Sequence, residues 1–286
     1  MRPKQWYKNL ILFVGIVFSR NLFDFSMWFN VISAFIIFCM LSGGDYVIND
    51  ILDVERDKMH PAKRKRPIAS GRLKKFYAIL FASILIILAL SGSYLINSLF
   101  FIVSVVFFFL HNAYTLFLKH VILVDVLTIA TNFVIRAIAG CLAISVLISP
   151  WLIICAFLLA LFLALGKRRH ELVLLGEEAK GHRKILEEYS TEMLDQMISI
   201  ASGALIISYS LYTFLADNNY MMLTIPFAVY GLFRYLFLVH AKNFGGETEM
   251  IFKDKGMLLS MVLWAVLVVL ILYGVPDVAV RVVGGG

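Results

Sequence analysis

Long apolar runs separated by short polar segments are the feature that most limits what this chain can fold into. Hydrophobic residues make up 61% of the 286 residues and charged residues only 16%, a balance that soluble domains of this length do not show. A helix needs about 20 apolar residues to cross the hydrocarbon core of a bilayer. The sequence therefore predicts an all-α integral membrane protein with about nine transmembrane helices, near residues 9–24, 28–52, 73–95, 97–118, 121–147, 151–170, 194–216, 220–241 and 257–274.

Basic residues are concentrated in alternate connections between these runs. They occur at the amino terminus and after the second, fourth, sixth and eighth runs, whereas the intervening connections carry almost none. The positive-inside rule predicts that the basic connections and the amino terminus are cytoplasmic, so that an odd number of spans leaves the carboxy terminus outside. Topology and anionic lipid also account for the net charge of +7. Because no nucleic-acid recognition module is visible, we expect no nucleic-acid binding.

An acidic cluster stands at the end of the second apolar run. It consists of Asn49, Asp50, Asp53 and Asp57, and in a helix the residues four apart share one face. A solvated helix end could carry such charges, but this cluster begins inside the apolar run, where polar groups without a partner are costly. Mg²⁺ takes oxygen ligands and often shares them with substrate phosphates. We therefore predict that these four residues hold a Mg²⁺–diphosphate group, with the three aspartates as catalytic residues.

Two long polar connections, residues 53–75 and 167–193, are predicted to lie on the cytoplasmic side and to cap an active site, because such a site needs water and irregular backbone. Pro61 should end the helix of the first connection near Met59. Guanidinium and ammonium groups suit phosphate oxygens, although topology alone explains many basic residues here. The candidate phosphate contacts are Lys8, Arg66, Lys119, Lys167 and Arg168.

A stripe of polar residues runs along the fifth apolar run at helical spacing. It comprises Asp125, Thr128, Asn132 and Arg136. Arg136 lies near the middle of the run and must face the bundle interior or a wet cavity. It is either the structural partner of an acid such as Asp45 or a substrate-binding residue. The other candidate substrate-binding residues are Tyr114, Glu171, Arg183 and Tyr189.

The chain resembles the UbiA-type intramembrane prenyltransferase superfamily, whose first aspartate-rich motif has the form N-D-x-x-D-x-x-x-D. The acidic cluster matches this motif without a gap. Within the superfamily the resemblance is strongest to the decaprenyl-phosphate phosphoribosyltransferase branch. The matching stretches extend over nearly the whole chain and include residues 2–6, 8–9, 53–57, 60–61, 66–71, 114, 119–120, 136–140, 166–168, 171–172 and 234–235.

The resemblance implies a single transmembrane domain over residues 1–286, with its helices around a central cavity and Mg²⁺ held by the acidic motif. It also implies transfer of 5-phosphoribosyl from 5-phosphoribosyl 1-diphosphate to a polyprenyl (decaprenyl) phosphate, with release of pyrophosphate. By the same resemblance the active site faces the cytoplasm of a bacterial cell, and the product feeds cell-wall arabinan precursor synthesis.

An aromatic prenyltransferase of the same superfamily, which uses a prenyl diphosphate, is the alternative. Such enzymes usually carry a second aspartate-rich motif after the sixth span, whereas residues 167–171 of this chain contain no aspartate. A transporter would be expected to show two related halves, and no internal repeat is visible. Homo-oligomerisation stays open, and the resemblance assigns no role to Asp45, Glu247 or Glu249.

Overall fold

Helices form every regular element in the residues that the computed structural model describes, which are 3–59, 63–147, 149–175, 186, 188–216, 218–241 and 253–275. Eight helical segments in these residues are long and apolar enough to cross a membrane. The chain is therefore a multi-pass membrane protein, and the predicted all-α class is confirmed. The eight segments are α2 (Phe25–Leu52), α4 (Lys75–Ile96), α5 (Ser98–Leu116), α6 (Val124–Ala143), α7 (Pro150–Leu175), α9 (Thr191–Leu215), α10 (Ile225–Ala241) preceded by η6 (Asn219–Thr224), and α11 (Lys255–Leu272).

The first predicted span, residues 9–24, is shorter in the structure than expected. An apolar helix covers Gln5–Phe18 and combines the 3₁₀ segment η1 (Pro3–Phe13) with α1 (Val14–Phe18). The chain then turns at Arg20, whose backbone is left-handed with φ 63°. Asp24 caps α2 by accepting a hydrogen bond from the backbone N–H of Ser26 at 2.9 Å. These two charged residues interrupt the apolar run, because one lies in the turn and the other starts the next helix.

The chain divides into two compact units. Unit 1 comprises residues 1–119 and 132–148, and unit 2 comprises residues 120–131 and 149–286. Helix α6 contributes its first turns to unit 2 and its remainder to unit 1. Unit 1 also contains the two short elements that follow α2, which are α3 (Val54–Met59) and the 3₁₀ turn η2 (Lys63–Lys65).

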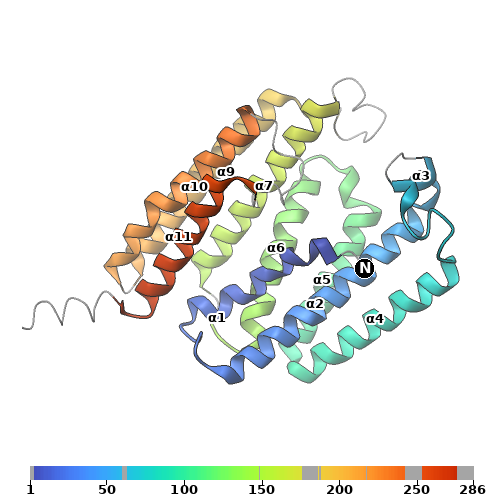
Figure 1. Cartoon of the computed structure of the whole chain (residues 1–286), viewed down its shortest axis with the longest axis horizontal. Helices are drawn as coiled ribbons and strands as arrows, with labels where there is room; N and C mark the ends of the chain where they lie inside the picture. Colours follow the sequence, from blue (N-terminus) through green and yellow to red (C-terminus); the bar gives the residue numbers. More distant parts are fainter. Residues whose placement is uncertain are drawn as a thin grey trace, which may run out of the picture. The chain divides into compact units, whose positions relative to one another are not determined.

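Unit 1 is built around α2, which packs along α4 (Figure 1). The ring of Phe38 on α2 lies 5.8 Å from that of Phe100 and 4.9 Å from that of Phe107, both on α5. Leu12 of η1 and Ala139 of α6 belong to the same buried cluster. Large aromatic side chains dominate the packing of such a core, and with Ala89 of α4 this cluster holds five elements of unit 1 together.

Gly140 allows η1 to lie directly against α6. A Cβ atom at this position would overlap the backbone oxygen of Leu12, so the two backbones would have to separate. We expect Gly140→Ala to destabilise the protein by about 1–3 kcal/mol, as overpacking of a core does. Thermal unfolding in detergent measures this loss.

Gly203→Ala on α9 is the matched control, because a Cβ atom there meets nothing within 4 Å and alanine favours a helix. Equal unfolding temperatures for the two variants would contradict the close approach of η1 to α6.

In unit 2, α7 packs along α9 and α10 packs along α11 (Figure 1). Phe162 of α7, Leu194 and Ile198 of α9, and Tyr235 of α10 form a buried cluster. The rings of Phe162 and Tyr235 lie 5.0 Å apart. This cluster underlies the end of α7 that carries the basic residues predicted to bind phosphate.

Helix α7 continues past the predicted end of its span at residue 170 and reaches Leu175. The prediction that a polar loop begins at residue 167 is therefore wrong for residues 167–175. The cause is local, because no Pro or Gly interrupts the chain between Gly166 and Gly176, and Arg168 pairs with Glu171 one turn later. Residues 176–185 and 187 lie outside the described residues.

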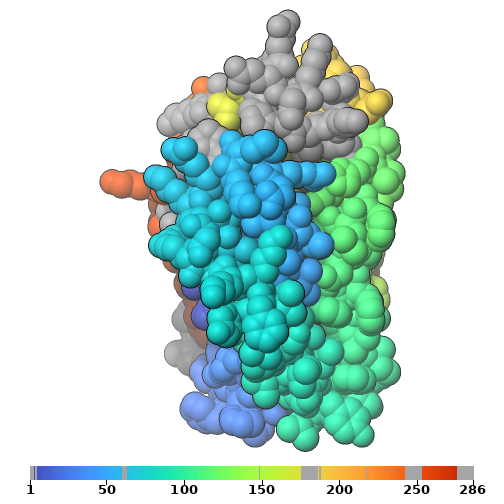
Figure 2. Space-filling model, turned by 90° about the vertical axis from the view of Figure 1, so that its right-hand side faces the viewer, coloured from blue at the N-terminus to red at the C-terminus, as the bar shows by residue number. Residues whose placement is uncertain are grey.

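Apolar side chains also cover much of the outer surface of unit 1. Figure 2 shows a face on which segments between α2 and α5, coloured blue to green, are exposed. Helix α4 exposes Phe76, Ile79, Ile87 and Leu88. Such a surface would favour aggregation in water, whereas in a bilayer it contacts acyl chains, as expected for a membrane span.

Candidate active site

The acidic cluster lies where α2 gives way to α3. Asp53 ends α2, yet its N–H still donates to the carbonyl of Asn49 at 2.9 Å, and the N–H of Asp57 donates to the carbonyl of Asp53 at 2.8 Å. The helical spacing is therefore kept through the junction, and Asn49, Asp53 and Asp57 follow one face as predicted. Helix α3 is described as far as Met59, the last described residue before residues 60–62.

Arg66 connects two of the predicted metal ligands. Its Nη1 donates to Asp50 Oδ1 at 3.1 Å and to Asp57 Oδ2 at 2.6 Å. The side chain of Asp57 is only 4% exposed. Arg66 is held in place by the turn after η2, where its backbone N–H donates to the carbonyl of Lys63 at 2.9 Å. The guanidinium group neutralises two carboxylates that would otherwise repel each other.

Asp53 faces two further cations at longer range. Lys119 Nζ lies 3.9 Å from Asp53 Oδ2, and Arg56 Nη1 lies 3.9 Å from Asp53 Oδ1. Lys119 comes from the turn after α5, so the predicted phosphate contact and the predicted metal ligand are close together in unit 1. Asn49 is half-buried one turn before Asp53.

The carboxylates of this cluster lie next to cationic side chains and do not form a complete metal-binding site by themselves. Among the described residues, no three His, Cys, Asp or Glu side chains form a group that could hold a metal ion. The chemistry of the cluster nevertheless fits Mg²⁺, because Asp50 and Asp57 direct hard carboxylate oxygens at one cationic group. Mg²⁺ commonly takes only one or two protein carboxylates and completes its coordination with water and substrate phosphates.

A second polar group lies in unit 2, nearly closed to solvent. Arg168 is 2% exposed; its Nε donates to Asp125 Oδ2 at 2.7 Å and its Nη1 donates to Glu171. The hydroxyl of Tyr189 donates to Asp125 Oδ1 at 3.1 Å and accepts from the N–H of Leu123 at 2.9 Å. Burial raises the pKa of Tyr189 to about 12, so the phenol keeps its proton at neutral pH.

This second group connects α6, α7 and the segment before α9. The charge of Arg168, a predicted phosphate contact, is matched within unit 2 by two carboxylates, and the hydroxyl of Tyr189 orients Asp125. The pairing of Asp125 with Arg168 was not predicted from the sequence, because the two residues are 43 positions apart. One signal was present, since a carboxylate within an apolar span needs a cationic partner.

The polar stripe of α6 is buried, as predicted, with Asp125, Thr128, Asn132 and Arg136 all at most 6% exposed. Arg136 Nε donates to Asn9 Oδ1 at 2.8 Å, and its Nη1 donates to the carbonyl of Asn132 at 3.0 Å. No carboxylate in the described part of the chain pairs with Arg136 within 4 Å, so the first of its two possible roles, an ion pair with an acid such as Asp45, is not formed there. Neutral oxygens take its place.

The remaining predicted residues are spread over both units. Lys8 of η1 and Tyr114 of α5 are half-buried in unit 1, and Lys167 of α7 is exposed in unit 2. Arg183 lies outside the described residues, as do Glu247 and Glu249.

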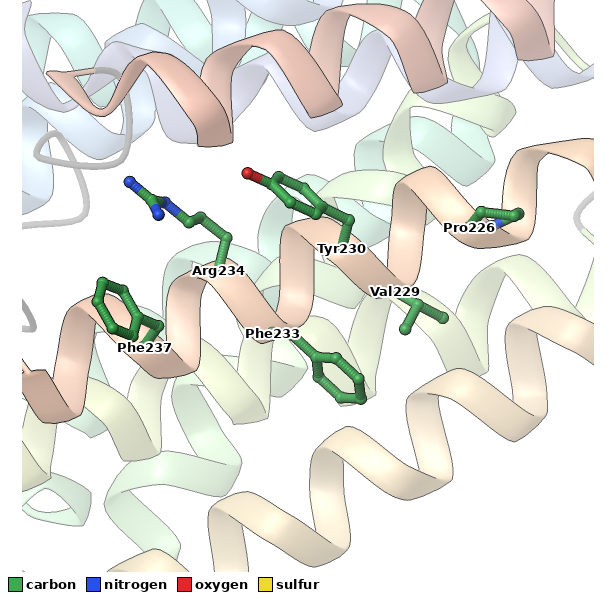
Figure 3. A pocket seen from close by; sticks show the side chains of 6 residues that line it. All are labelled: Pro226, Val229, Tyr230, Phe233, Arg234 and Phe237. Atoms are coloured by element: carbon green, nitrogen blue, oxygen red, sulfur yellow. The ribbon is translucent and has the colours of Figure 1, made fainter.

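A groove of about 540 Å³ runs along α10 in unit 2 (Figure 3). Its one cationic side chain, Arg234, donates to Asp254 Oδ1 at 3.0 Å and Oδ2 at 2.9 Å. Arg234 therefore fastens α10 to the start of α11. The groove is otherwise mostly apolar and suits acyl chains. Its lining residues are Pro226, Val229, Tyr230, Phe233, Arg234 and Phe237.

Comparisons with known proteins identify the family and agree with the fold. Residues 10–253 match the UbiA prenyltransferase family. A decaprenyl-phosphate phosphoribosyltransferase of Mycolicibacterium smegmatis is 31% identical over 281 residues, covering 92% of this chain and 88% of that protein. One from Corynebacterium glutamicum is 31% identical over 287 residues, covering 96% and 86%.

A structural comparison gives the same fold. The structure of a UbiA homolog from Archaeoglobus fulgidus bound to DMAPP and Mg²⁺ matches with a TM-score of 0.72 at 15% identity, covering 95% of this chain and 96% of that one. The sequence match extends over both units and includes the acidic cluster of α2 and α3. The chain therefore belongs to the UbiA prenyltransferase family.

Proposed function

We propose that this protein transfers a 5-phosphoribosyl group from 5-phosphoribosyl 1-diphosphate to a polyprenyl phosphate and releases pyrophosphate. The observation that carries the proposal is the convergence of Asp50 and Asp57 on Arg66, with Asp53 beside Lys119. This cluster combines acidic ligands for a metal–diphosphate group with cations for phosphate. Similarity to two phosphoribosyltransferases over most of the chain supports this substrate class.

In this proposal, Asp50, Asp53 and Asp57, together with Asn49, hold Mg²⁺ on the diphosphate of the donor. A bound Mg²⁺ supplies Lewis-acid stabilisation of the charge on the leaving group. Arg66, which neutralises two of the aspartates in this structure, is then available to a phosphate oxygen. The Archaeoglobus homolog of the same fold was solved with Mg²⁺ bound, which supports the use of a divalent cation in general.

The acceptor needs little activation, because a phosphate monoester is already an anionic nucleophile near neutral pH. The task of the protein is therefore to position the two substrates and to stabilise charge. Lys8, Lys119 and Lys167 are the proposed contacts to their phosphates, and Tyr114 is proposed to orient them. The lack of an aspartate at residues 167–171 disfavours an aromatic prenyltransferase, which usually carries a second acidic motif.

We further propose that the chain acts as one transmembrane domain of a bacterial cell membrane, with its active site open to the cytoplasm. The connection 53–75 would cap this site, together with residues 167–193, which comprise the last turns of α7, the polar connection that follows and the start of α9. The basic residues of these connections support a cytoplasmic orientation of the active site. The proposed donor substrate is highly charged, so it is expected in the cytoplasm. The product would serve cell-wall arabinan precursor synthesis.

Transfer of label into lipid tests the proposal. Purified protein in lipid nanodiscs receives decaprenyl phosphate and 5-phosphoribosyl 1-diphosphate labelled in the ribose. Label should pass into the organic phase. This transfer should stop when the divalent cations are chelated and resume when Mg²⁺ is added. A parallel reaction with a prenyl diphosphate and a phenolic acceptor should give no product. The opposite pattern, with label left in the water and the phenol prenylated, would establish the alternative function.

A further inference from the structure

Asp45 is a buried acid that the proposed reaction does not yet use. It lies on α2 four residues before Asn49, hence on the same helix face as the acidic cluster and about 6 Å deeper along the axis. Asp45 is 2% exposed. Its Oδ1 accepts from Asn112 Nδ2 at 2.8 Å, whereas no group in the described part of the chain bonds to its Oδ2.

The surroundings of Asp45 are arranged to hold it in place. Asn112 of α5 also donates to the carbonyl of Phe108 at 2.8 Å, so its amide is fixed between its own helix and the carboxyl group. Coulombic attraction links Asp45 to Arg136, yet the two form no direct ion pair. Arg136 instead rests over the ring of Phe107 at 4.6 Å and donates to neutral oxygens.

If Asp45 had only a structural role, its buried Oδ2 atom would be left without a hydrogen bond. Buried carboxylates and guanidinium groups in proteins are normally paired and fully hydrogen-bonded, because an unsatisfied buried polar group is costly. Here the Oδ2 atom of Asp45 lacks a hydrogen-bond partner in the described part of the chain, one helical turn from the cluster proposed to hold the diphosphate of the substrate. A ligand hydroxyl would supply the missing bond.

We infer that Asp45 is a specificity residue that accepts a hydrogen bond from a ribose hydroxyl of the donor, with Arg136 as the nearby balancing charge. The inference rests on the proposed function. Carboxylates bind ribose hydroxyls in other nucleotide sites for the same chemical reason. A prenyl diphosphate offers no hydroxyl to Asp45, so this residue distinguishes a sugar donor from an isoprenoid donor.

Donor analogues that lack one hydroxyl test the inference. The 2-deoxy and 3-deoxy forms of 5-phosphoribosyl 1-diphosphate are compared with the normal donor by kcat/KM. The unmodified protein should prefer the normal donor over at least one analogue by about 10- to 100-fold, since a buried polar group would be left without its partner. In Asp45→Ala this preference should fall to about threefold or less, mainly through loss of activity with the normal donor.

Two further variants keep the test decisive. Asp45→Asn retains the shape of the side chain and should also weaken the preference, so it replaces Asp45→Ala if that variant does not fold. Asp24→Asn makes the same change at the N-cap, the opposite end of α2, and should leave the preference unchanged. If folded Asp45 variants keep the preference for the normal donor, the inference alone is overturned. If the unmodified protein transfers no phosphoribosyl group from the normal donor, the proposed function is overturned and the inference with it.

Discussion

Asp53→Asn is expected to lower turnover by at least about 100-fold, the scale of losing one group that stabilises transition-state charge. Asn keeps the size of the side chain but removes the negative charge that would hold the metal–diphosphate group. The fold should survive, because Asp53 is 24% exposed and its two cationic contacts are both at 3.9 Å. The measurement is kcat for phosphoribosyl transfer, together with the thermal unfolding temperature.

Glu55→Gln provides the matched control for this prediction. Glu55 lies two residues away on α3, is exposed, and pairs only with Lys58 at 3.0 Å among the described residues. Its loss should leave kcat within about twofold, because exposed ion pairs contribute little. Near-normal turnover of Asp53→Asn would remove this residue from the proposed metal site.

Arg168→Met is expected to destabilise the protein by about 3–5 kcal/mol, the cost of breaking a buried ion pair from one side. The variant leaves the carboxylate of Asp125, 0% exposed at its side chain, with Tyr189 and a backbone N–H as its only donors among the described residues. Thermal and denaturant unfolding in detergent micelles measure the loss.

Arg169→Met separates this effect from the general loss of a basic residue. Arg169 is the next residue of α7 and pairs with Asp195, whose side chain is 35% exposed. Its removal should cost about 1 kcal/mol or less, because water solvates the carboxylate that remains. If both variants were equally stable, the buried pair of Arg168 with Asp125 would not hold unit 2 together.

The sequence predicted the helical class and the acidic cluster because both depend on local periodicity. Apolar runs of bilayer length show directly where spans lie, and the four-residue spacing of Asn49, Asp53 and Asp57 survives the junction of α2 and α3. The first span was less predictable, because its length depends on how Arg20 and Asp24 shape a turn.

The partners of the charged residues could not be predicted in the same way. Arg66 was expected to contact substrate phosphate, but it lies between Asp50 and Asp57, a contact that depends on how the turn after η2 folds back. Arg136 was a candidate partner for a buried acid and instead bonds to Asn9, 127 residues away. Such contacts arise from tertiary packing, which single-sequence periodicity does not contain.

A mass spectrum of the lipid formed from both substrates tests the central claim most directly. Protein in nanodiscs is incubated with Mg²⁺, 5-phosphoribosyl 1-diphosphate and a defined polyprenyl phosphate. The molecular mass of the extracted lipid is then measured. The account predicts an acceptor heavier by one phosphoribosyl group, formed with one pyrophosphate per molecule and missing in Asp53→Asn. An acceptor of unchanged mass after incubation with active, folded protein would contradict the account.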